Sequence, residues 1–298
     1  MPTRRIRLVP RTPCLTFPVG ENLACQSGSG VLAFSGGAYP NLPAGWSILT
    51  DHDFTSKTEG GWWDTGSSNF TIVTASGAGG TTVDSMASQY NRLTEYTGRA
   101  TYPVGFAGGS GPINTGYDIA PAGRNVGLYL RFNMAVSSAF VGHSSGVNKI
   151  WFLVGGTSAS GPAYFSAQGA GSAALDFQVR TQRTPSAGGG ARNLPANVGA
   201  ATFTRGTRAT VEVILRMNTC QADGTANADG TCDVWFDGTK SHTYTDVVYR
   251  GNGSTGGELP QTALFNLVKW NPTWGGTGGT IAVAQYMYMY DCAVGTGT

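Results

Sequence analysis

The sequence predicts an all-β fold, a two-sheet antiparallel β-sandwich of the jelly-roll type preceded by an extended N-terminal arm. Short runs that alternate apolar and polar residues recur along most of the 298-residue chain, and this period of two is typical of half-buried strands. Gly-rich turns separate the runs, and the chain contains 45 glycines. No segment keeps a helical period of 3.6 residues, apart from a weak pattern over residues 83–93.

The clearest alternating runs lie after residue 46. They cover residues 70–74, 128–134, 149–154, 175–180, 210–217, 233–237 and 283–290. Many short strands with regular turns indicate a sandwich or jelly roll, and the lack of a repeat at a fixed period argues against a propeller or solenoid.

The two strands within residues 210–238 form a predicted hairpin with a long loop. Val211, Val213 and Leu215 alternate with Thr210, Glu212, Ile214 and Arg216, so we expect the first set to share one face, towards the core. Cys220 and Cys232 stand at the two strand ends, where a disulfide would close the loop, and we predict this bridge. Metal ligation is the alternative, although no CxxC pair or neighbouring histidine supports it.

The chain has five cysteines, so at least one of them has no disulfide partner within the chain. Cys14 and Cys25 are close enough in sequence to form a local disulfide. Cys292 is then the expected unpaired thiol.

Composition narrows the class of protein. Charged residues make up only 12% of the chain, against about 25% in typical soluble domains. Low charge with many glycines and short polar residues suits extracellular or virion β-proteins. The net charge of +2 does not indicate nucleic-acid binding, and no apolar run approaches the ~18 residues of a membrane span. Residues 1–10 are basic, but no apolar segment follows them, so we expect no secretory leader.

Residues 1–45 differ from the rest of the chain. Four prolines precede residue 20, and strand-like alternation is weak. We predict an arm over residues 1–45, either disordered or docked on a neighbouring subunit, followed by one β-sandwich domain over residues 46–298.

Several motifs occur in a familiar order after residue 128. They are LYLRFNMAVSSAFVGHSSGVNKIWFLVGG (128–156), DVWFDG (233–238) and KWNPTWGGTGG (269–279). Their order resembles the concanavalin A-like lectin/glucanase superfamily, in the polysaccharide-lyase-like form also seen in phage and environmental proteins. The likeness covers about residues 46–294, and it implies fold much more than activity.

The resemblance implies a carbohydrate site on a concave sheet. Outward-facing candidates are Arg131, Lys149, Trp151, Gln178 and Arg180. Arginine forks and amides suit sugar hydroxyls and carboxylates, and a tryptophan face suits a sugar ring. The alternative is that these side chains form ordinary cross-strand polar pairs.

A lyase of this superfamily would need a base and a group that neutralises a uronate carboxylate. His143, Lys149 and Tyr164 are the candidates, with Gln168, Asn266 and Lys269 also available. The characteristic alginate-lyase motifs are absent, and His143 is expected to be a loop residue. The carboxylate pattern of a glucanase is also missing.

The loop over residues 222–233 contains Asp223, Asp229 and Asp233. Oxygen-rich loops of this kind hold Ca²⁺ in some proteins, but the pattern does not match an EF-hand, and Asp-Gly pairs also form turns. Calcium is therefore the single cofactor considered, and the main expectation is that the protein needs none.

The leading hypothesis is a non-enzymatic virion surface protein, such as a capsid decoration or tail component. It would bind neighbouring virion subunits or copies of itself, and its exposed face would contact host polysaccharide. The alternatives are a polysaccharide lyase that cleaves anionic glycans by β-elimination and a secreted carbohydrate-binding module.

Overall fold

The computed structural model describes residues 39–77, 82–89, 96–119, 126–155, 163–181, 192–195, 200–252 and 259–297. The chain divides into two compact units, Met1–Asn41 and Leu42–Thr298, and the fold below is that of the second unit. Residues 1–38 of the predicted arm lie outside the described residues, and so do Cys14 and Cys25. The arm, its boundary at residue 45 and this cysteine pair stay predictions.

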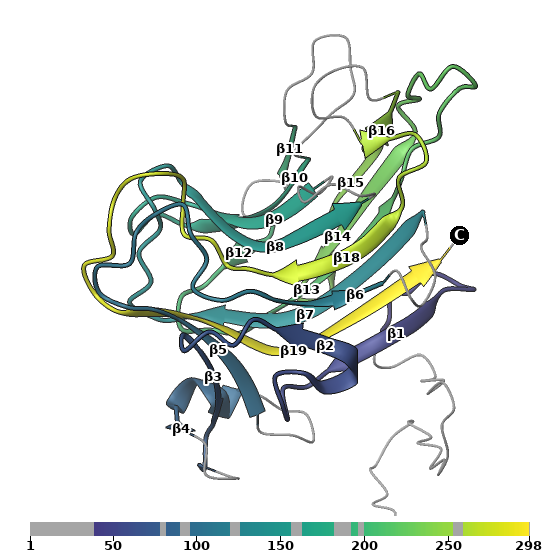
Figure 1. Ribbon diagram of the computed structural model, residues 1–298. Helices are drawn as coiled ribbons and strands as arrows, with labels where there is room; N and C mark the ends of the chain where they lie inside the picture. The colour runs from purple at the N-terminus through teal and green to yellow at the C-terminus, as the bar shows by residue number, and fades with distance from the viewer. Residues whose placement is uncertain are drawn as a thin grey trace, which may run out of the picture. The chain divides into compact units, whose positions relative to one another are not determined.

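Two large sheets form the unit (Figure 1). The strands of sheet A are β1 (Ser47–His52), β3 (Phe70–Thr74), β4 (Thr82–Val83), β5 (Tyr96–Tyr102), β7 (Gly127–Val136), β13 (Ala209–Arg216), β14 (Gly230–Phe236), β15 (Thr239–Val247) and β19 (Gln285–Gly297). They run in the order β15-β14-β13-β7-β19-β5-β3-β4, and β1 also pairs with β19.

Sheet B packs against sheet A. Its strands are β2 (Trp62–Asp64), β6 (Thr115–Asp118), β8 (Val147–Gly155), β9 (Ala163–Gln168), β10 (Leu175–Thr181), β11 (Asn193–Pro195), β12 (Thr202–Phe203) and β18 (Phe265–Trp270). They run in the order β11-β10-β9-β8-β18-β6-β2, and β12 pairs with β10.

Smaller elements lie outside these two layers. They are the parallel pair β16 (Arg250–Gly251) and β17 (Leu259–Pro260) and the 3-10 helices η1 (Glu59–Gly61) and η3 (Ser85–Gln89). No helix in the described part of the chain is long and apolar enough to cross a membrane.

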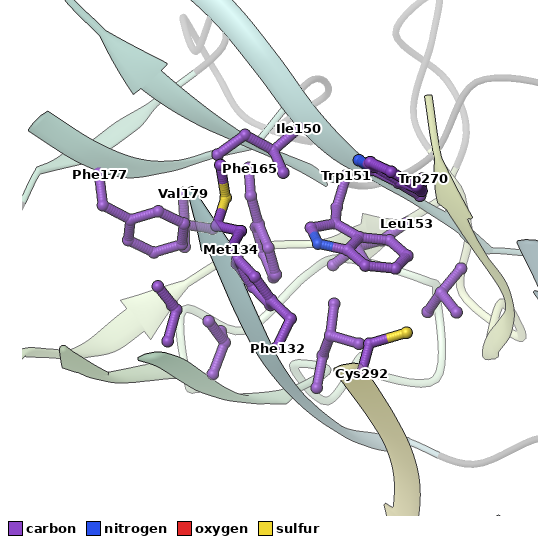
Figure 2. Close-up of a cluster of buried hydrophobic side chains, with 14 of the residues drawn as sticks. Phe132, Met134, Ile150, Trp151, Leu153, Phe165, Phe177, Val179, Trp270 and Cys292 are labelled. Atoms are coloured by element: carbon purple, nitrogen blue, oxygen red, sulfur yellow. The ribbon is translucent and has the colours of Figure 1, made fainter. Parts of the chain in front are cut away.

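The core fills the space between the sheets (Figure 2). Phe132 of sheet A contacts rings of sheet B, with centroids 5.8 Å from Trp151 and 6.4 Å from Phe165. All three side chains are fully buried. Burying large aromatic rings stabilises a fold by both their area and their ring contacts, so these contacts bind the two layers together.

The all-β sandwich predicted from the sequence is confirmed, and each of the main alternating runs is a strand. The weak helical pattern over residues 83–93 corresponds, in its described part, to a short 3-10 helix instead of an α-helix. There, β4 ends at Val83 and η3 is a short 3-10 helix; residues 90–93 lie outside the described residues.

Candidate functional site

The candidate site lies on the outer face of sheet B, the face turned away from sheet A. Phe165 of β9 and Val179 of β10 point into the core and are fully buried. Successive residues of a strand face opposite sides of the sheet. Tyr164 and Arg180, the next residues along these strands, therefore lie on the outer face.

A bulge in β8 decides which residues of that strand reach the outer face. Lys149 pairs with Ser166 and Trp151 pairs with Phe165, so Ile150 is an extra residue between the two pairs. Ile150 and Trp151 are both fully buried in the core. Lys149 before the bulge and Phe152 beyond it are half-buried, and they share the outer face.

A row of side chains crosses sheet B on this face. Cross-strand pairs join Arg180 to Tyr164, Tyr164 to Phe152, and Phe152 to Lys269. The Lys149 ammonium lies beside the row, 5.2 Å from the centre of the Tyr164 ring and 5.3 Å from that of Phe152. We call these five residues the cation–aromatic row, because two neighbouring aromatic rings lie between positive groups along it.

Trp63 extends this row at the edge of the sheet. Lys269 pairs with Gly116 of β6, and Gly116 pairs with Trp63 of β2. A Cβ atom on Gly116 would lie 2.8 Å from Cζ2 of Trp63 and 2.5 Å from the Val268 carbonyl oxygen. Glycine is thus required for the indole to lie close over β6.

A cavity of about 330 Å³ opens beside the row. This volume lies within the usual range of small-molecule sites, about 300–1,000 Å³. The cavity is lined by Ser145, Val147, Lys149, Tyr164, Arg180, Gly275 and Gly276. These described lining residues include two cations and no carboxylate, so the cavity attracts anions.

Burial changes the acid–base properties of two groups in the cavity. It lowers the pKa of the Lys149 amine, and the positive charge of Arg180 lowers this pKa further. It raises the pKa of the Tyr164 phenol, while the charge of Arg180 and a hydrogen bond from it act in the opposite direction. Lys149 therefore releases its proton more readily than an ordinary lysine does.

His143 lies behind one wall of the cavity and is only 3% exposed. Nδ1 accepts a hydrogen bond from the Ser145 backbone N–H at 3.0 Å, which assigns the ring proton to Nε2. Nε2 then donates to the Gly278 carbonyl oxygen at 2.8 Å. The backbone of Gly275 lies directly against the ring, since a Cβ there would be 1.9 Å from Cγ. With both nitrogens engaged, His143 holds the loop that forms the wall.

The structure brings several predicted residues together and separates others. Lys149, Tyr164 and Arg180 line one cavity. Gln178 lies on the same face of β10, where it pairs with Ser166. Gln168 donates to the Ser166 hydroxyl at 2.8 Å, at the far end of β9.

Two predicted binding residues lie elsewhere. Trp151 is in the core, because the bulge at Ile150 reverses the faces of β8, and its indole is not accessible to a sugar. Arg131 is on β7 of sheet A, where its Nη1 lies 3.3 Å from Oδ1 of Asp291. The prediction that these two line the same face as Arg180 is wrong.

Phe152, which belongs to the row, and Trp63, which extends it, were not identified from the sequence. Strict alternation over residues 149–154 placed Phe152 on the core face. The run Ile150–Val154 is apolar at every position, and such a run in a half-exposed strand is a signal that alternation is broken. Trp63 has no such signal, because Trp62 and Trp63 are identical neighbours and only Trp62 is buried in the core.

The predicted Cys220–Cys232 disulfide is wrong, since both thiols are free. Cys232 pairs with Leu215 across the hairpin and points into the core. Cys220 lies beyond the end of β13, with Sγ 3.7 Å from the Arg250 carbonyl oxygen. Cys292 is also free, as expected, and is fully buried.

The three weak calcium candidates have separate partners. Asp223 accepts from the Thr225 backbone N–H, and Asp229 accepts from the Thr219 hydroxyl. Asp233 forms an ion pair with Lys240 at 2.8 Å. Within the described ranges, no three His, Cys, Asp or Glu residues are grouped as metal ligands would be.

Comparison with known proteins identifies the class of fold. No protein-family model and no curated protein sequence matches the chain. Two of the solved structures that are similar over most of its length have TM-scores above 0.5. The endo-β-1,4-glucuronan lyase of the fungus Trichoderma reesei is 14% identical, covers 84% of this chain and 96% of its own, and has a TM-score of 0.53. The alginate lyase vAL-1 from a Chlorella virus is 13% identical, with coverages of 84% and 100% and a TM-score of 0.55.

The protein therefore has the concanavalin A-like jelly-roll fold, as the sequence motifs implied. At this level of identity the likeness establishes a shared fold and nothing more about activity.

Proposed function

We propose that the protein binds an anionic polysaccharide across the outer face of sheet B. The observation that carries this proposal is the order of Arg180, Tyr164, Phe152 and Lys269 along the cation–aromatic row, in which two neighbouring rings are flanked by cations. A uronate sugar has a flat apolar face and a carboxylate, which suit a ring and a cation respectively. Neighbouring strands lie about 4.8 Å apart, a spacing similar to the length of one pyranose unit.

The two similar structures support this choice of ligand, since one is named for glucuronan and the other for alginate. Both are anionic polymers. The row crosses the strands, so a bound chain would also run across them, from Arg180 towards Trp63.

Binding is tested with polyglucuronate by isothermal titration calorimetry. Lys149→Ala and Arg180→Ala should each weaken binding about tenfold, which corresponds to about 1.4 kcal/mol. The control is Lys240→Ala, which removes a lysine from β15 of sheet A. Equal affinity in wild type and both site variants would reject the site.

β-Elimination is a second candidate function, favoured by the lowered pKa of Lys149 beside Tyr164 and Arg180. A neutral Lys149 amine would take the C5 proton, the freed electron pair would form the C4–C5 double bond, and the C4–O4 bond would break. Tyr164 would protonate the departing O4, while Arg180 would neutralise the carboxylate.

Ultraviolet absorbance of the unsaturated product tests this reaction. Product from wild type and none from Tyr164→Phe, with polyglucuronate affinity retained, would support elimination. Absence of product from wild type with both polyglucuronate and alginate would reject cleavage and leave the binding proposal standing.

We propose that the protein lies on the surface of a virion, where the ligand of this site would be host polysaccharide. The alternative is a secreted protein. The virion proposal rests on the composition of the chain and on the predicted arm. Antibodies against the protein should label intact particles if the virion setting is correct, and labelling of the culture medium alone would reject it.

A further inference from the structure

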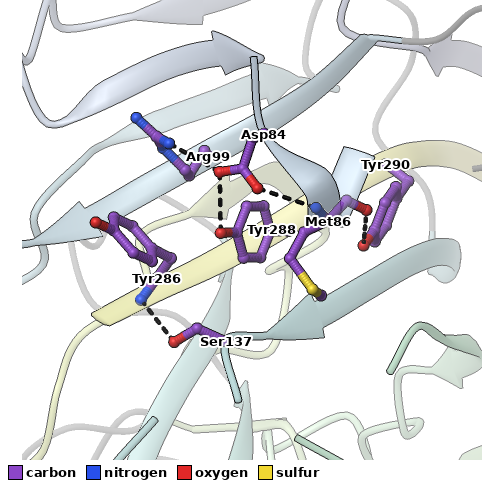
Figure 3. A network of polar contacts seen from close by, with 7 residues as sticks. All are labelled: Asp84, Met86, Arg99, Ser137, Tyr286, Tyr288 and Tyr290. Atoms are coloured by element: carbon purple, nitrogen blue, oxygen red, sulfur yellow. Dashed lines mark hydrogen bonds and ion pairs between the residues drawn. The ribbon is translucent and has the colours of Figure 1, made fainter. Parts of the chain in front are cut away.

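A second cavity, of about 310 Å³, lies on the outer face of sheet A, on the opposite side of the sandwich from the cation–aromatic row. Figure 3 shows the polar contacts of residues that line it, among them Asp84, Arg99 and Tyr288. Its lining includes Asp84, Ser85, Arg99, Ser138, Tyr286 and Tyr288. These side chains come from the start of η3, from β5, from the turn after β7 and from β19.

Strand β19 supplies the aromatic floor of this cavity. Met287 and Met289 point into the core, so Tyr286 and Tyr288 lie on the outer face. The ring centroids of the two tyrosines are 6.0 Å apart. Arg99 pairs with Tyr288 across β5 and β19, and its guanidinium carbon lies 5.0 Å from the centre of the Tyr286 ring.

An ion pair holds the floor in place. Arg99 Nη1 donates to Oδ2 of Asp84 at 2.8 Å, and the Tyr288 hydroxyl donates to the same oxygen at 3.1 Å. The other carboxylate oxygen accepts from the Met86 backbone N–H at 3.0 Å. The arginine, the carboxylate and the Tyr288 ring are thus fixed before any ligand arrives, which lowers the entropy cost of binding.

The charges of this cavity favour a neutral ligand. Asp84 offsets the positive charge of Arg99, and no second cation is among the described lining residues. A carboxylate or sulfate would therefore meet Asp84 without a free positive partner. The hydroxyls of Ser85, Ser138 and Tyr286 have no hydrogen-bond partner within the described part of the chain, so they are available to a polar, uncharged molecule.

We propose that this cavity is a second saccharide site, which binds a neutral sugar residue against Tyr286. An aromatic ring for the apolar face of the sugar and fixed polar groups for its hydroxyls are what such a ligand requires. The inference does not depend on the function proposed for sheet B, because the two sites lie on different sheets and differ in charge.

Ligand-observed saturation-transfer NMR of the full chain tests the proposal. The probes are methyl β-D-glucopyranoside, methyl β-D-galactopyranoside and methyl α-D-mannopyranoside. At least one should bind wild type, and Tyr286→Ala should weaken its binding at least tenfold. Ser138→Phe, at an exposed position of the turn, should fill the cavity and have the same effect.

Tyr244→Ala is the matched control, because Tyr244 is a half-buried tyrosine at the other edge of sheet A. It should leave probe binding unchanged, and so should Arg180→Ala in the sheet B site. The proposal is overturned if none of the three probes binds wild type, or if Tyr286→Ala binds as well as wild type. If a methyl glucuronide binds wild type more tightly than the neutral probes do, and Tyr286→Ala abolishes this binding, the proposal that the ligand is a neutral sugar is overturned.

Discussion

The Lys149 ammonium lies 5.2 Å from the centre of the Tyr164 ring, on the outer face of sheet B. The Arg180 guanidinium lies 6.0 Å from the same ring. Two cations thus contact one aromatic ring. The ring attracts each of them, but the contact also brings their two positive charges close together. Burial of Lys149, and next to it the positive charge of Arg180, lower the pKa of the amine.

Binding of an anionic polysaccharide should therefore weaken with rising pH before ordinary lysines lose their charge, near 10.5. The protonated amine binds the anion, and Lys149 loses its proton at a lower pH than usual. Lys149→Arg should keep its affinity over this range, because arginine stays charged. Titrations of polyglucuronate at successive pH values measure the effect, and superimposable profiles for the two proteins would contradict it.

Acid should destabilise the fold through His52, which is fully buried and stacks on Phe54 with centroids 4.2 Å apart. Desolvation lowers its pKa from 6.5 to about 4. Between these values the unfolded chain binds the proton and the folded chain does not, so stability falls as pH falls through this window. The loss from this one group is up to about 3 kcal/mol.

Urea unfolding at neutral and acidic pH measures this effect. His52→Asn, whose Oδ1 can accept the bond that the Phe54 N–H now donates to Nδ1, should lose less stability on acidification than wild type. His242, with a pKa also lowered to about 4, contributes in the same direction and remains in the variant. Identical losses in the two proteins would refute the role of His52.

The thiols of the native protein should differ in reactivity. Cys220 is partly exposed, whereas Cys232 and Cys292 are fully buried, and burial raises the pKa of both buried thiols. Iodoacetamide should label Cys220 in the native state, and the other two only after unfolding. Peptide mapping by mass spectrometry identifies which cysteines are labelled. A cross-linked peptide joining Cys220 to Cys232 would contradict the arrangement described here.

Gly275→Ala should destabilise the protein by about 2 kcal/mol or more. Its φ is +71°, and the added methyl group would collide with the His143 ring. The wall of the sheet B cavity would shift, so polyglucuronate binding should weaken too. Gly276→Ala is the control, because no heavy atom lies within 4 Å of its Cβ position. Equal unfolding free energies for the two variants would be evidence against this packing.

Much of the fold was predictable because its strands alternate over many residues. The pattern of β10 places Phe177 and Val179 inside and Gln178 and Arg180 outside, and the structure agrees. Alternation failed in β8, where the extra residue Ile150 reverses the faces. A bulge depends on the register of two paired strands, so one strand's sequence does not reveal it.

The site was only partly predictable for a related reason. Lys149, Tyr164 and Arg180 could be chosen by residue type, but which of the candidates meet depends on the order of strands in the sheets. Arg131 has the same chemistry and the same alternation, yet it belongs to sheet A. The hairpin cysteines failed similarly, because proximity in sequence does not fix the direction of a side chain.

Strand β19 comes last among the described strands but lies inside sheet A, between β7 and β5. It also pairs with β1, where Ser47 lies opposite Thr296. β5 can pair with β3, and β7 with β13, before β19 is in place. These two parts of sheet A are joined only by β19, so the sheet cannot be completed until this strand is added. Such long-range pairing is characteristic of slow folding. Pulsed hydrogen exchange during refolding should show the amides of β5 and β7 that face β19 gaining protection together with those of β19. Early protection of these amides, before those of β19, would argue against this order.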